Sequence, residues 1–244
     1  NNCSTLRLFC CIKLKKIKMI LGNGLIASLF RDMDQENIIF FASGVSNSLE
    51  TSPEEFLREE NLIRKTFTDN PEKLFIYFST CSIYDSSKTG SDYVLHKLKM
   101  EQLIKNSCKK YLILRVSNAV GNGGNPNLLM NYLIRSIKNN ETINVHTKAT
   151  RNLIDAEDIK NITFQLLEKS DFNKIINVAY LYNYSIIEIL EMVERFYDIK
   201  LNLNLIKSGS GYDVNIPDVE DYFRINDLNN KESYLCGILE KYYS

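Results

Sequence analysis

Residues 22–27 read Gly-Asn-Gly-Leu-Ile-Ala, and this G-x-G-x-x-A stretch decides the fold. It directly follows an apolar run, residues 17–21, whose composition predicts a buried β-strand. It also leads into residues 25–30, which predict the first turns of a helix. A glycine-rich turn between a strand and a helix is the setting in which this short pattern indicates a dinucleotide-binding site.

Each small residue of the turn has its own physical role. Gly22 permits a tight turn, Gly24 lets the backbone come close to a pyrophosphate, and Ala27 lets the helix pack closely on the strand. The unpaired amides at the helix start would then face the phosphates. Taken alone, the pattern fits a tight turn without any ligand equally well. The predicted cofactor contacts in this turn are Gly22, Gly24, Leu25 and Ile26.

The rest of the chain alternates short apolar runs with amphipathic stretches. Continuous apolar strands that are each followed by a helix imply a parallel sheet covered on both faces. Further strands are predicted at residues 38–42, 74–79, 111–116, 143–146, 174–179 and 201–206. Further helices are predicted at residues 53–68, 93–106, 128–138, 156–168, 186–197 and 232–243, with capping boxes at Ser52/Glu55 and Ser185/Glu188.

The predicted fold class is α/β, a Rossmann-type parallel sheet with helices on both faces and a small C-terminal substrate lobe. The sheet is trimmed after its first βα unit, because the segment between Phe30 and Ile38 leaves no room for the usual second and third strands. The glycine- and asparagine-rich segment 121–127 marks a break in composition. We therefore predict a dinucleotide-binding domain over residues 13–120 and 151–180, and a substrate lobe over residues 121–150 and 181–244.

One expected partner of the cofactor is missing from the sequence. A Rossmann site usually supplies an acidic residue about 20 residues after the glycine turn, where it binds the ribose. That spacing falls near Gly44, and the stretch Phe41-Ala42-Ser43-Gly44 holds no acid. Ala42, Ser43 and Gly44 are nevertheless predicted to contact the cofactor. Three explanations stay open: a shortened second strand, NADP in place of NAD, or a different grip on the adenosine end.

Tyr93 and Lys97 form a Y-x-x-x-K pair on a predicted helix, where a spacing of four residues puts both side chains on one face. A phenol normally ionises near pH 10, and a nearby ammonium favours the phenolate. Lys97 would thus make Tyr93 a better acid or base, and a hydroxyl such as that of Thr80 would orient the substrate oxygen. Without the glycine turn upstream, a surface pair would explain Y-x-x-x-K better.

Together these motifs resemble the extended short-chain dehydrogenase/reductase family, in its NAD-dependent epimerase/dehydratase branch that acts on nucleotide sugars. The resemblance covers about residues 17–190. Its motifs in order are GNGLIA at 22–27, FASG at 41–44, STCSIY at 79–84, YVLHK at 93–97, RVSNAVG at 115–121, PNLLM at 126–130, RNLID at 151–155 and INVA at 176–179. An ordered series of this kind is far more specific than any single motif.

The resemblance implies hydride transfer between NAD or NADP and a nucleotide-linked sugar, either as 4-keto reduction or as epimerisation. It implies Thr80, Tyr93 and Lys97 as catalytic residues, with Tyr93 and Lys97 also touching the cofactor. The implied substrate contacts are Thr80, Cys81, Ser82, Asn118, Leu129 and Arg151. Asn118 and Arg151 would meet the diphosphate, although a turn cap and a surface ion pair are the plainer explanations of these two.

The sequence also departs from that family. Relatives that dehydrate sugars carry Asp-Glu after the catalytic threonine, whereas Cys81 and Ser82 stand here, so a 4,6-dehydratase is disfavoured. The loop between Thr80 and Tyr93 is short, and the C-terminal tail lacks an arginine that many relatives add to the diphosphate site. A dinucleotide-binding module without catalysis is therefore the alternative to an enzyme.

Composition narrows the function classes further. The 244 residues are 44% hydrophobic and 25% charged with a formal net charge of zero, which does not indicate a nucleic-acid partner. Six scattered cysteines, no CxxC pair and two histidines give no metal cluster and suggest a reducing compartment. No apolar stretch is long enough to span a bilayer. We expect a cytoplasmic protein without membrane partners. The family resemblance also implies a homodimer, formed through the two helices that flank the active site, one of which carries Tyr93.

Overall fold

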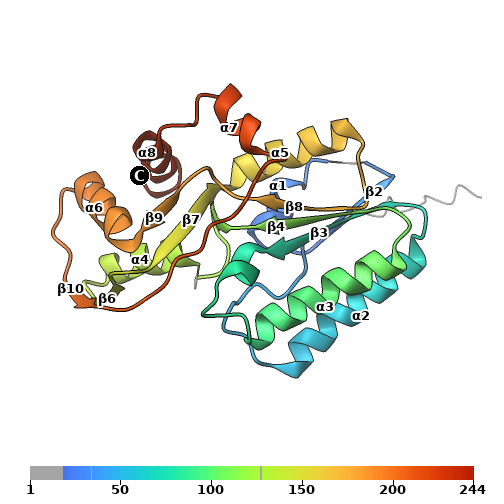
Figure 1. Ribbon diagram of the computed structural model, residues 1–244, viewed down its shortest axis with the longest axis horizontal. Coiled ribbons are helices and arrows are strands. Elements are labelled where there is room, and N and C mark those ends of the chain that lie inside the picture. The colour runs from blue at the N-terminus through green and yellow to red at the C-terminus, as the bar shows by residue number, and fades with distance from the viewer. Residues whose placement is uncertain (1–18, 34, 127) are drawn as a thin grey trace, which may run out of the picture.

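A five-stranded parallel sheet forms the core of the computed structural model, which describes residues 19–33, 35–126 and 128–244 (Figure 1). The strand order is β1-β2-β3-β4-β8. The strands are β1 (Ile20–Leu21), β2 (Ile38–Phe41), β3 (Leu74–Thr80), β4 (Tyr111–Val116) and β8 (Lys174–Val178). The predicted strands of the sheet are confirmed, apart from residues 17 and 18 of the first, which lie outside the described residues together with the remainder of the N-terminal segment.

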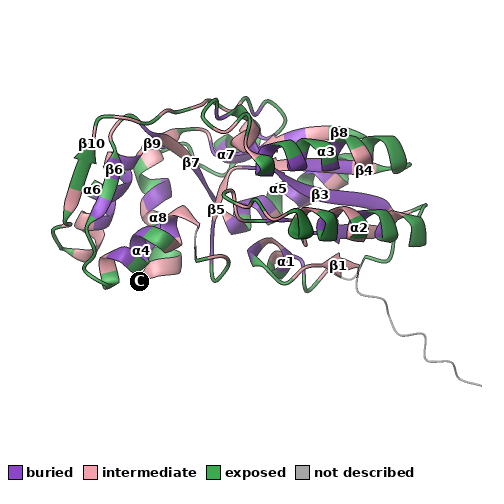
Figure 2. Cartoon of the chain, turned by 90° about the horizontal axis from the view of Figure 1, so that it is seen from below, coloured by how far each residue is buried: buried purple, intermediate pink, exposed green. Residues whose placement is uncertain are grey.

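Helices cover both faces of this sheet, as predicted. They are α1 (Leu25–Leu29), α2 (Pro53–Asp69), α3 (Asp92–Ser107) and α5 (Ala156–Lys169). Figure 1 shows α2 and α3 side by side along one face and α5 along the other. Figure 2 shows β3 buried between helices whose outer sides are exposed.

The two faces follow from the alternation of side chains along each strand. Phe41, Tyr77 and Ile113 belong to one buried cluster, which is completed by residues of α2 and α3. The intervening residues, such as Phe40 and Ile76, belong to the other cluster, on the side of α1 and α5. Every strand of the sheet interior is thus apolar on both faces, which is why the strands read as unbroken apolar runs.

The helix caps agree with the predicted ones in part. Ser185 and Glu188 form the complete capping box at the start of α6 (Ile186–Tyr197). At the start of α2, Ser52 Oγ accepts a hydrogen bond from the amide of Glu55. The carboxylate of Glu55 pairs with Arg58 instead of returning to the cap, so the predicted reciprocal box is wrong there.

Strand β1 pairs directly with β2, in register Ile20–Phe40 and Leu21–Phe41. In a complete Rossmann sheet the first strand has the second and third strands on its outer side. Here the chain passes from α1 straight to β2, and β1 is the last strand of the sheet in the part of the chain that the structure describes. The predicted trimming after the first βα unit is therefore confirmed.

The C-terminal part of the chain builds smaller sheets. β5 (Asn118–Val120), β7 (Thr150–Asp155) and β9 (Asn183–Ser185) form one, and β6 (Ile143–His146) pairs with β10 (Leu203–Ile206) in another. Helices α4 (Leu129–Lys138), α6, α7 (Glu220–Ile225) and α8 (Lys231–Tyr243) pack around them. The sequence did not predict β5, β7, β9 or α7, and it placed a polar loop where α7 forms.

Candidate active site

A cavity of about 240 Å³ opens at the carboxyl ends of the main strands. Thr80 ends β3, Ala42 and Gly44 follow β2, and Ser117 follows β4; all four residues line it. The carboxyl edge of an open parallel sheet is where such folds bind ligands.

The cavity brings together nine of the predicted site residues. These are Ile26, Ala42, Gly44, Thr80, Ser82, Tyr93, Lys97, Asn118 and Leu129. Six predicted residues are not among those that line it: Gly22, Gly24, Leu25, Ser43, Cys81 and Arg151. The three predicted catalytic residues thus share one cavity, and the glycine turn and the arginine lie outside its lining.

Helix α3 positions the predicted acid/base pair. Ser91 caps this helix by accepting a hydrogen bond from the amide of Val94, and Tyr93 and Lys97 then fall on the same buried side. Their exposed fractions are 7% and 2%. Lys97 Nζ lies 5.9 Å from the centre of the Tyr93 ring. The ammonium is therefore close enough to influence the phenol electrostatically.

Glu59 of α2 is the residue of the site that sequence analysis missed. Its carboxylate is fully buried and 3.0 Å from Lys97 Nζ. Burial alone would raise the pKa of Glu59, but the Lys97 ammonium and hydrogen bonds from His96, Tyr77 and the Val45 amide hold that pKa well below its ordinary value. A signal was present in the sequence, because Glu59 falls on the apolar side of its helix, between Phe56 and Ile63.

This buried ion pair gives the fold an acid-sensitive element. Because the folded-state pKa of Glu59 is lowered, the stability it contributes is complete above the unfolded value of about 4.3 and is lost as the pH falls further. We expect Glu59→Gln to lower the free energy of unfolding at neutral pH by about 3–5 kcal/mol, because Lys97 loses its buried counter-charge. Between about pH 5 and pH 3 its melting temperature should fall less than that of the wild type. If thermal unfolding showed equal falls in melting temperature for the variant and the wild type over this pH range, the lowered pKa of Glu59 would be contradicted.

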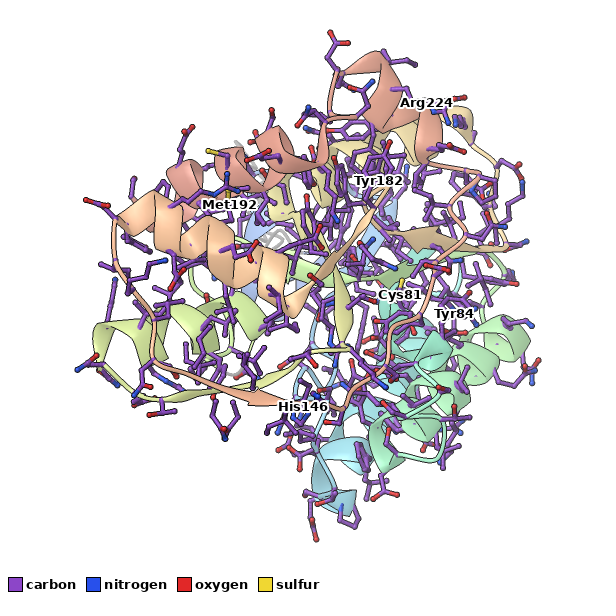
Figure 3. All side chains as sticks on the ribbon, turned by 60° about the vertical axis from the view of Figure 1, so that its left-hand side comes forward. Cys81, Tyr84, His146, Tyr182, Met192 and Arg224 are labelled. Atoms are coloured by element: carbon purple, nitrogen blue, oxygen red, sulfur yellow. The ribbon has the colours of Figure 1, made fainter. Side chains whose placement is uncertain are left out.

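Thr80 and its neighbours form the hydroxyl side of the site. Thr80 Oγ1 accepts a hydrogen bond from the Ser82 amide at 3.0 Å and begins the short 3-10 helix η1 (Cys81–Tyr84). Cys81, labelled in Figure 3, is not among the residues that line the cavity: it is fully buried, and its thiol donates to the carbonyl of Arg115 at 3.0 Å. Burial raises the pKa of this thiol to about 12. The structure therefore gives Cys81 a packing role and does not bring it to the predicted substrate contact.

The predicted diphosphate contacts are held by backbone carbonyls. Asn118 Nδ2 donates to the carbonyl of Asn152 at 2.8 Å, and Asn118 still lines the cavity. Arg151 Nη1 donates to the carbonyls of Thr150 and Ser210, at 2.7 and 3.2 Å, so this nitrogen of the guanidinium is engaged by the backbone around it. The ion pair considered for Arg151 at the sequence level is not formed with any described residue.

Several other residues line the cavity without having been predicted, and among them are Lys88 and Tyr212. Lys88, in the loop before α3, donates to Ser48 Oγ at 3.3 Å, and Tyr212 closes the cavity from the C-terminal segment. Burial and, to a smaller extent, the charge of Arg151 lower the pKa of Lys88. Among the described lining residues Lys88 and Lys97 carry the formal charges, and Lys97 is already ion-paired. Lys88 therefore gives the cavity a positive character.

The glycine turn packs closely on the end of β2 and leaves open space beside it. Gly22 has φ +127°, and a Cβ there would lie 2.2 Å from the carbonyl oxygen of Ala42. A Cβ on Gly24 would meet nothing within 4 Å, so the turn presents open space at that position. The close approach of the turn to β2 and the open face at Gly24 fit a dinucleotide that runs from the turn toward Tyr93.

The described residues contain no group of three His, Cys, Asp or Glu side chains placed to hold a metal ion. None of their helices combines the length and the apolar character that crossing a bilayer requires.

A Rossmann-type sheet with threonine, tyrosine and lysine in one cavity at its carboxyl edge defines a protein of the extended short-chain dehydrogenase/reductase class. The chain belongs to the NAD dependent epimerase/dehydratase family, whose profile matches residues 19–179. The family and the fold class predicted from the sequence are thereby confirmed. No match was found among curated protein sequences.

Solved structures share this fold at low sequence identity. A UDP-glucuronic acid 4-epimerase variant from Bacillus cereus, in complex with UDP-4-deoxy-4-fluoro-glucuronic acid and NAD, is 19% identical with a TM-score of 0.67, over 91% of this chain and 78% of that one. UDP-N-acetylglucosamine 4-epimerase from Methanobrevibacter ruminantium M1 is 16% identical with a TM-score of 0.64, over 92% and 80%. RMD from Pseudomonas aeruginosa, complexed with NADPH, is 14% identical with a TM-score of 0.63, over 84% and 80%.

Proposed function

We propose that this protein uses NAD or NADP to reduce or epimerise a nucleotide-linked sugar, with Tyr93 as the proton-transfer group. The observation that carries the proposal is the shared cavity of Thr80, Tyr93 and Lys97 at the carboxyl edge of the sheet. Family membership supports the cofactor and reaction class. Two of the similar structures are named as 4-epimerases of UDP-linked sugars, which supports the substrate class.

Each side chain of the set has a separate task in this proposal. Tyr93 gives or takes the proton of the sugar hydroxyl, and Thr80 orients that oxygen through a hydrogen bond. Lys97 favours the ionised phenol by its charge and offers a donor to the cofactor ribose. When bound, the dinucleotide supplies or accepts the hydride. Gly22, Gly24, Leu25, Ile26, Ala42, Ser43 and Gly44 would hold it.

The proposed substrate class follows from other residues that line the cavity. Asn118, Ser82 and Leu129 line the cavity, and the ammonium of Lys88 favours an anionic substrate such as a sugar diphosphate. With Cys81 buried and Ser82 neutral, the positions after Thr80 carry no acid for eliminating water. Reduction or epimerisation therefore fits the site better than 4,6-dehydration. In this proposal residues 121–150 and 181–244 form the substrate lobe, and residues 13–120 and 151–180 hold the cofactor.

A dinucleotide-binding module without catalysis is the second candidate. The observation that favours it is the engagement of Lys97, whose ammonium contacts both oxygens of Glu59 and the hydroxyl of Tyr77. To bind Lys97, a cofactor ribose would have to share the ammonium with Glu59 and Tyr77 or displace one of these two residues from it.

One experiment separates the two candidates. The intact protein is titrated with NADH and NADPH by fluorescence, and UDP-glucose, UDP-glucuronic acid, UDP-N-acetylglucosamine and 4-keto nucleotide sugars are then offered with each cofactor. Conversion of any of these sugars, followed by chromatography of the nucleotide sugars, is the expected result. Cofactor binding without conversion of any sugar would favour the module, and absence of cofactor binding would contradict both candidates.

A further inference from the structure

A row of three polar side chains crosses the main sheet just before the carboxyl ends of its strands. Ser79 of β3, Arg115 of β4 and Asn177 of β8 are aligned with one another in the register of the parallel ladders. Each stands one residue before the last residue of its strand. Because side chains alternate along a strand, the row shares its face of the sheet with Tyr77 and Ile113, which pack against α2 and α3. The row therefore lies at the cavity end of the face that α3 covers.

Glu101 of α3 binds this row with both of its carboxylate oxygens. Ser79 Oγ donates to Oε1 at 2.6 Å. Arg115 donates from Nε to Oε1 at 2.9 Å and from Nη2 to Oε2 at 2.6 Å. Glu101 is 3% exposed, so water competes little for these bonds. Two N–H donors on two oxygens fix the direction of a contact as well as its length.

The guanidinium of Arg115 is itself held in place by a third contact. Its Nη1 donates to Tyr84 OH at 3.0 Å, and Tyr84 OH donates to Asn177 Oδ1 at 3.0 Å. Tyr84 is the last residue of η1, the short helix that Thr80 caps. Glu101 is therefore joined through Arg115 to the segment that follows Thr80, in addition to its bond to the strand that precedes it.

The position of Glu101 in the sequence links this row to the catalytic set. Glu101 lies four residues after Lys97 and eight after Tyr93. With 3.6 residues per turn, all three fall on one side of α3, and all three are buried. Ser79 is the residue directly before Thr80. The bond from Ser79 to Glu101 thus joins the helix that carries Tyr93 and Lys97 to the strand that carries Thr80.

Apolar packing sets the position of α3 along the sheet less precisely. Met100 and Ile104 hold the helix against the sheet in a buried cluster. Such contacts are non-directional, so they keep the helix on the sheet without defining its place along the strand. The directional bonds of Glu101 supply that definition. Precision matters here, because a misplacement of about 1 Å between reacting groups can lower a rate by about 100-fold.

We propose that Glu101 is a positioning residue that holds Tyr93 at the separation from Thr80 that proton transfer requires. Glu101 is not among the residues that line the cavity, and it acts through Ser79 and Arg115. This inference rests on the proposed function for its effect on turnover, whereas its effect on α3 can be measured without a substrate.

The kinetic test uses Glu101→Gln, which keeps the size of the side chain and removes the charge that Arg115 binds. We expect kcat to fall by about 10–100-fold. The KM for the nucleotide sugar and the affinity for NADH should stay within about threefold, because the lost contact affects only the transition state. The sugar is the one converted among UDP-glucose, UDP-glucuronic acid, UDP-N-acetylglucosamine and 4-keto nucleotide sugars. A rise in KM with kcat unchanged would overturn the proposal.

A matched control removes another ion pair of the same helix. Glu60 of α2 pairs with Lys99 of α3 at 2.7 Å, at the surface of the protein. Glu60→Gln should leave kcat unchanged, because exposed pairs contribute little and this one does not reach the sheet. Equal losses of kcat in Glu60→Gln and Glu101→Gln would overturn the proposal, since any loosening of α3 would then suffice.

A double variant separates position from stability, and it also serves if Glu101→Gln does not fold. Glu101→Gln with Arg115→Gln leaves no unpaired buried charge, so its melting temperature should exceed that of Glu101→Gln. Its kcat should nevertheless stay at least about tenfold below that of the wild type, because two amides do not rebuild the paired bonds. Recovery of kcat together with the melting temperature would show a purely structural role and overturn the proposal.

Amide hydrogen exchange measures the helix without turnover. In the double variant, the amides of residues 93–104 in α3 should exchange at least about tenfold faster than in the wild type, whereas those of α5, on the other face of the sheet, should change less. Equal changes in α3 and α5 would overturn the inference. An inactive wild type whose double variant shows the expected exchange pattern would contradict the proposed function alone.

Discussion

Replacing Tyr93 with phenylalanine is expected to lower turnover on the nucleotide sugar by roughly 10²–10⁴-fold, the usual contribution of a positioned acid or base. The variant keeps the ring that packs against Val45 and Val94 and loses the hydroxyl alone. Cofactor affinity should therefore stay within about threefold, because the packing and the glycine turn are unchanged. Steady-state kinetics and a fluorescence titration with NADH measure the two quantities separately.

A matched control is available on the same sheet. Tyr111 begins β4, at the edge opposite to the carboxyl ends that carry the cavity, and Tyr111→Phe should leave turnover unchanged. If Tyr93→Phe and Tyr111→Phe had equal activity, Tyr93 would not be the proton-transfer group. If Tyr93→Phe lost cofactor binding as well as turnover, the phenol would serve binding and not proton transfer.

The second large effect is expected at the glycine turn. Gly22→Ala places a Cβ 2.2 Å from the carbonyl oxygen of Ala42 and keeps a backbone φ of +127° that alanine rarely adopts. Relief of the clash requires β1 and its turn to move away from β2. We expect a loss of about 3 kcal/mol or more in stability, which corresponds to a fall of about 6–12 °C in melting temperature.

Gly24 provides the comparison within the same turn. Its φ is −81° and a Cβ there meets nothing within 4 Å, so Gly24→Ala should change the melting temperature by less than about 2 °C. If the open space at Gly24 receives the pyrophosphate, the same variant should weaken NADH binding by about tenfold. Equal melting temperatures for the two variants would contradict the strained turn, and full NADH affinity in Gly24→Ala would remove the phosphate from this position.

Much of the main sheet could be predicted because its strands are buried on both faces and its turns carry glycine, proline and capping residues. The short strands β5 and β9 could not be, since three residues give no periodicity that distinguishes a strand from a loop. Helix α7 was missed for a similar reason, because six residues after a polar stretch form barely more than one turn.

Site residues were predicted where a sequence motif fixes their spacing, and they were missed where contacts between charged residues from different elements bring them together. The spacing of Tyr93 and Lys97 places both on one helical face, whatever surrounds them. Glu59 lies on the apolar side of its helix, but a sequence does not reveal that Lys97, Tyr77 and His96 converge on it from other elements. Arg151 was assigned from its motif, and the hydrogen bonds that its Nη1 donates to the carbonyls of Thr150 and Ser210 are contacts made only in the folded chain.

The direct pairing of β1 with β2 explains how a parallel sheet tolerates the loss of strands at one edge. A strand in a parallel sheet is hydrogen bonded only to its immediate neighbours, so elements can be absent from one margin while the remaining ladders keep their register. The cavity lies over β2, β3 and β4, inward of that margin. A parallel sheet can therefore lose strands beyond β1, where one end of a long ligand would lie, without moving the residues of β2, β3 and β4 that line the cavity at the other end.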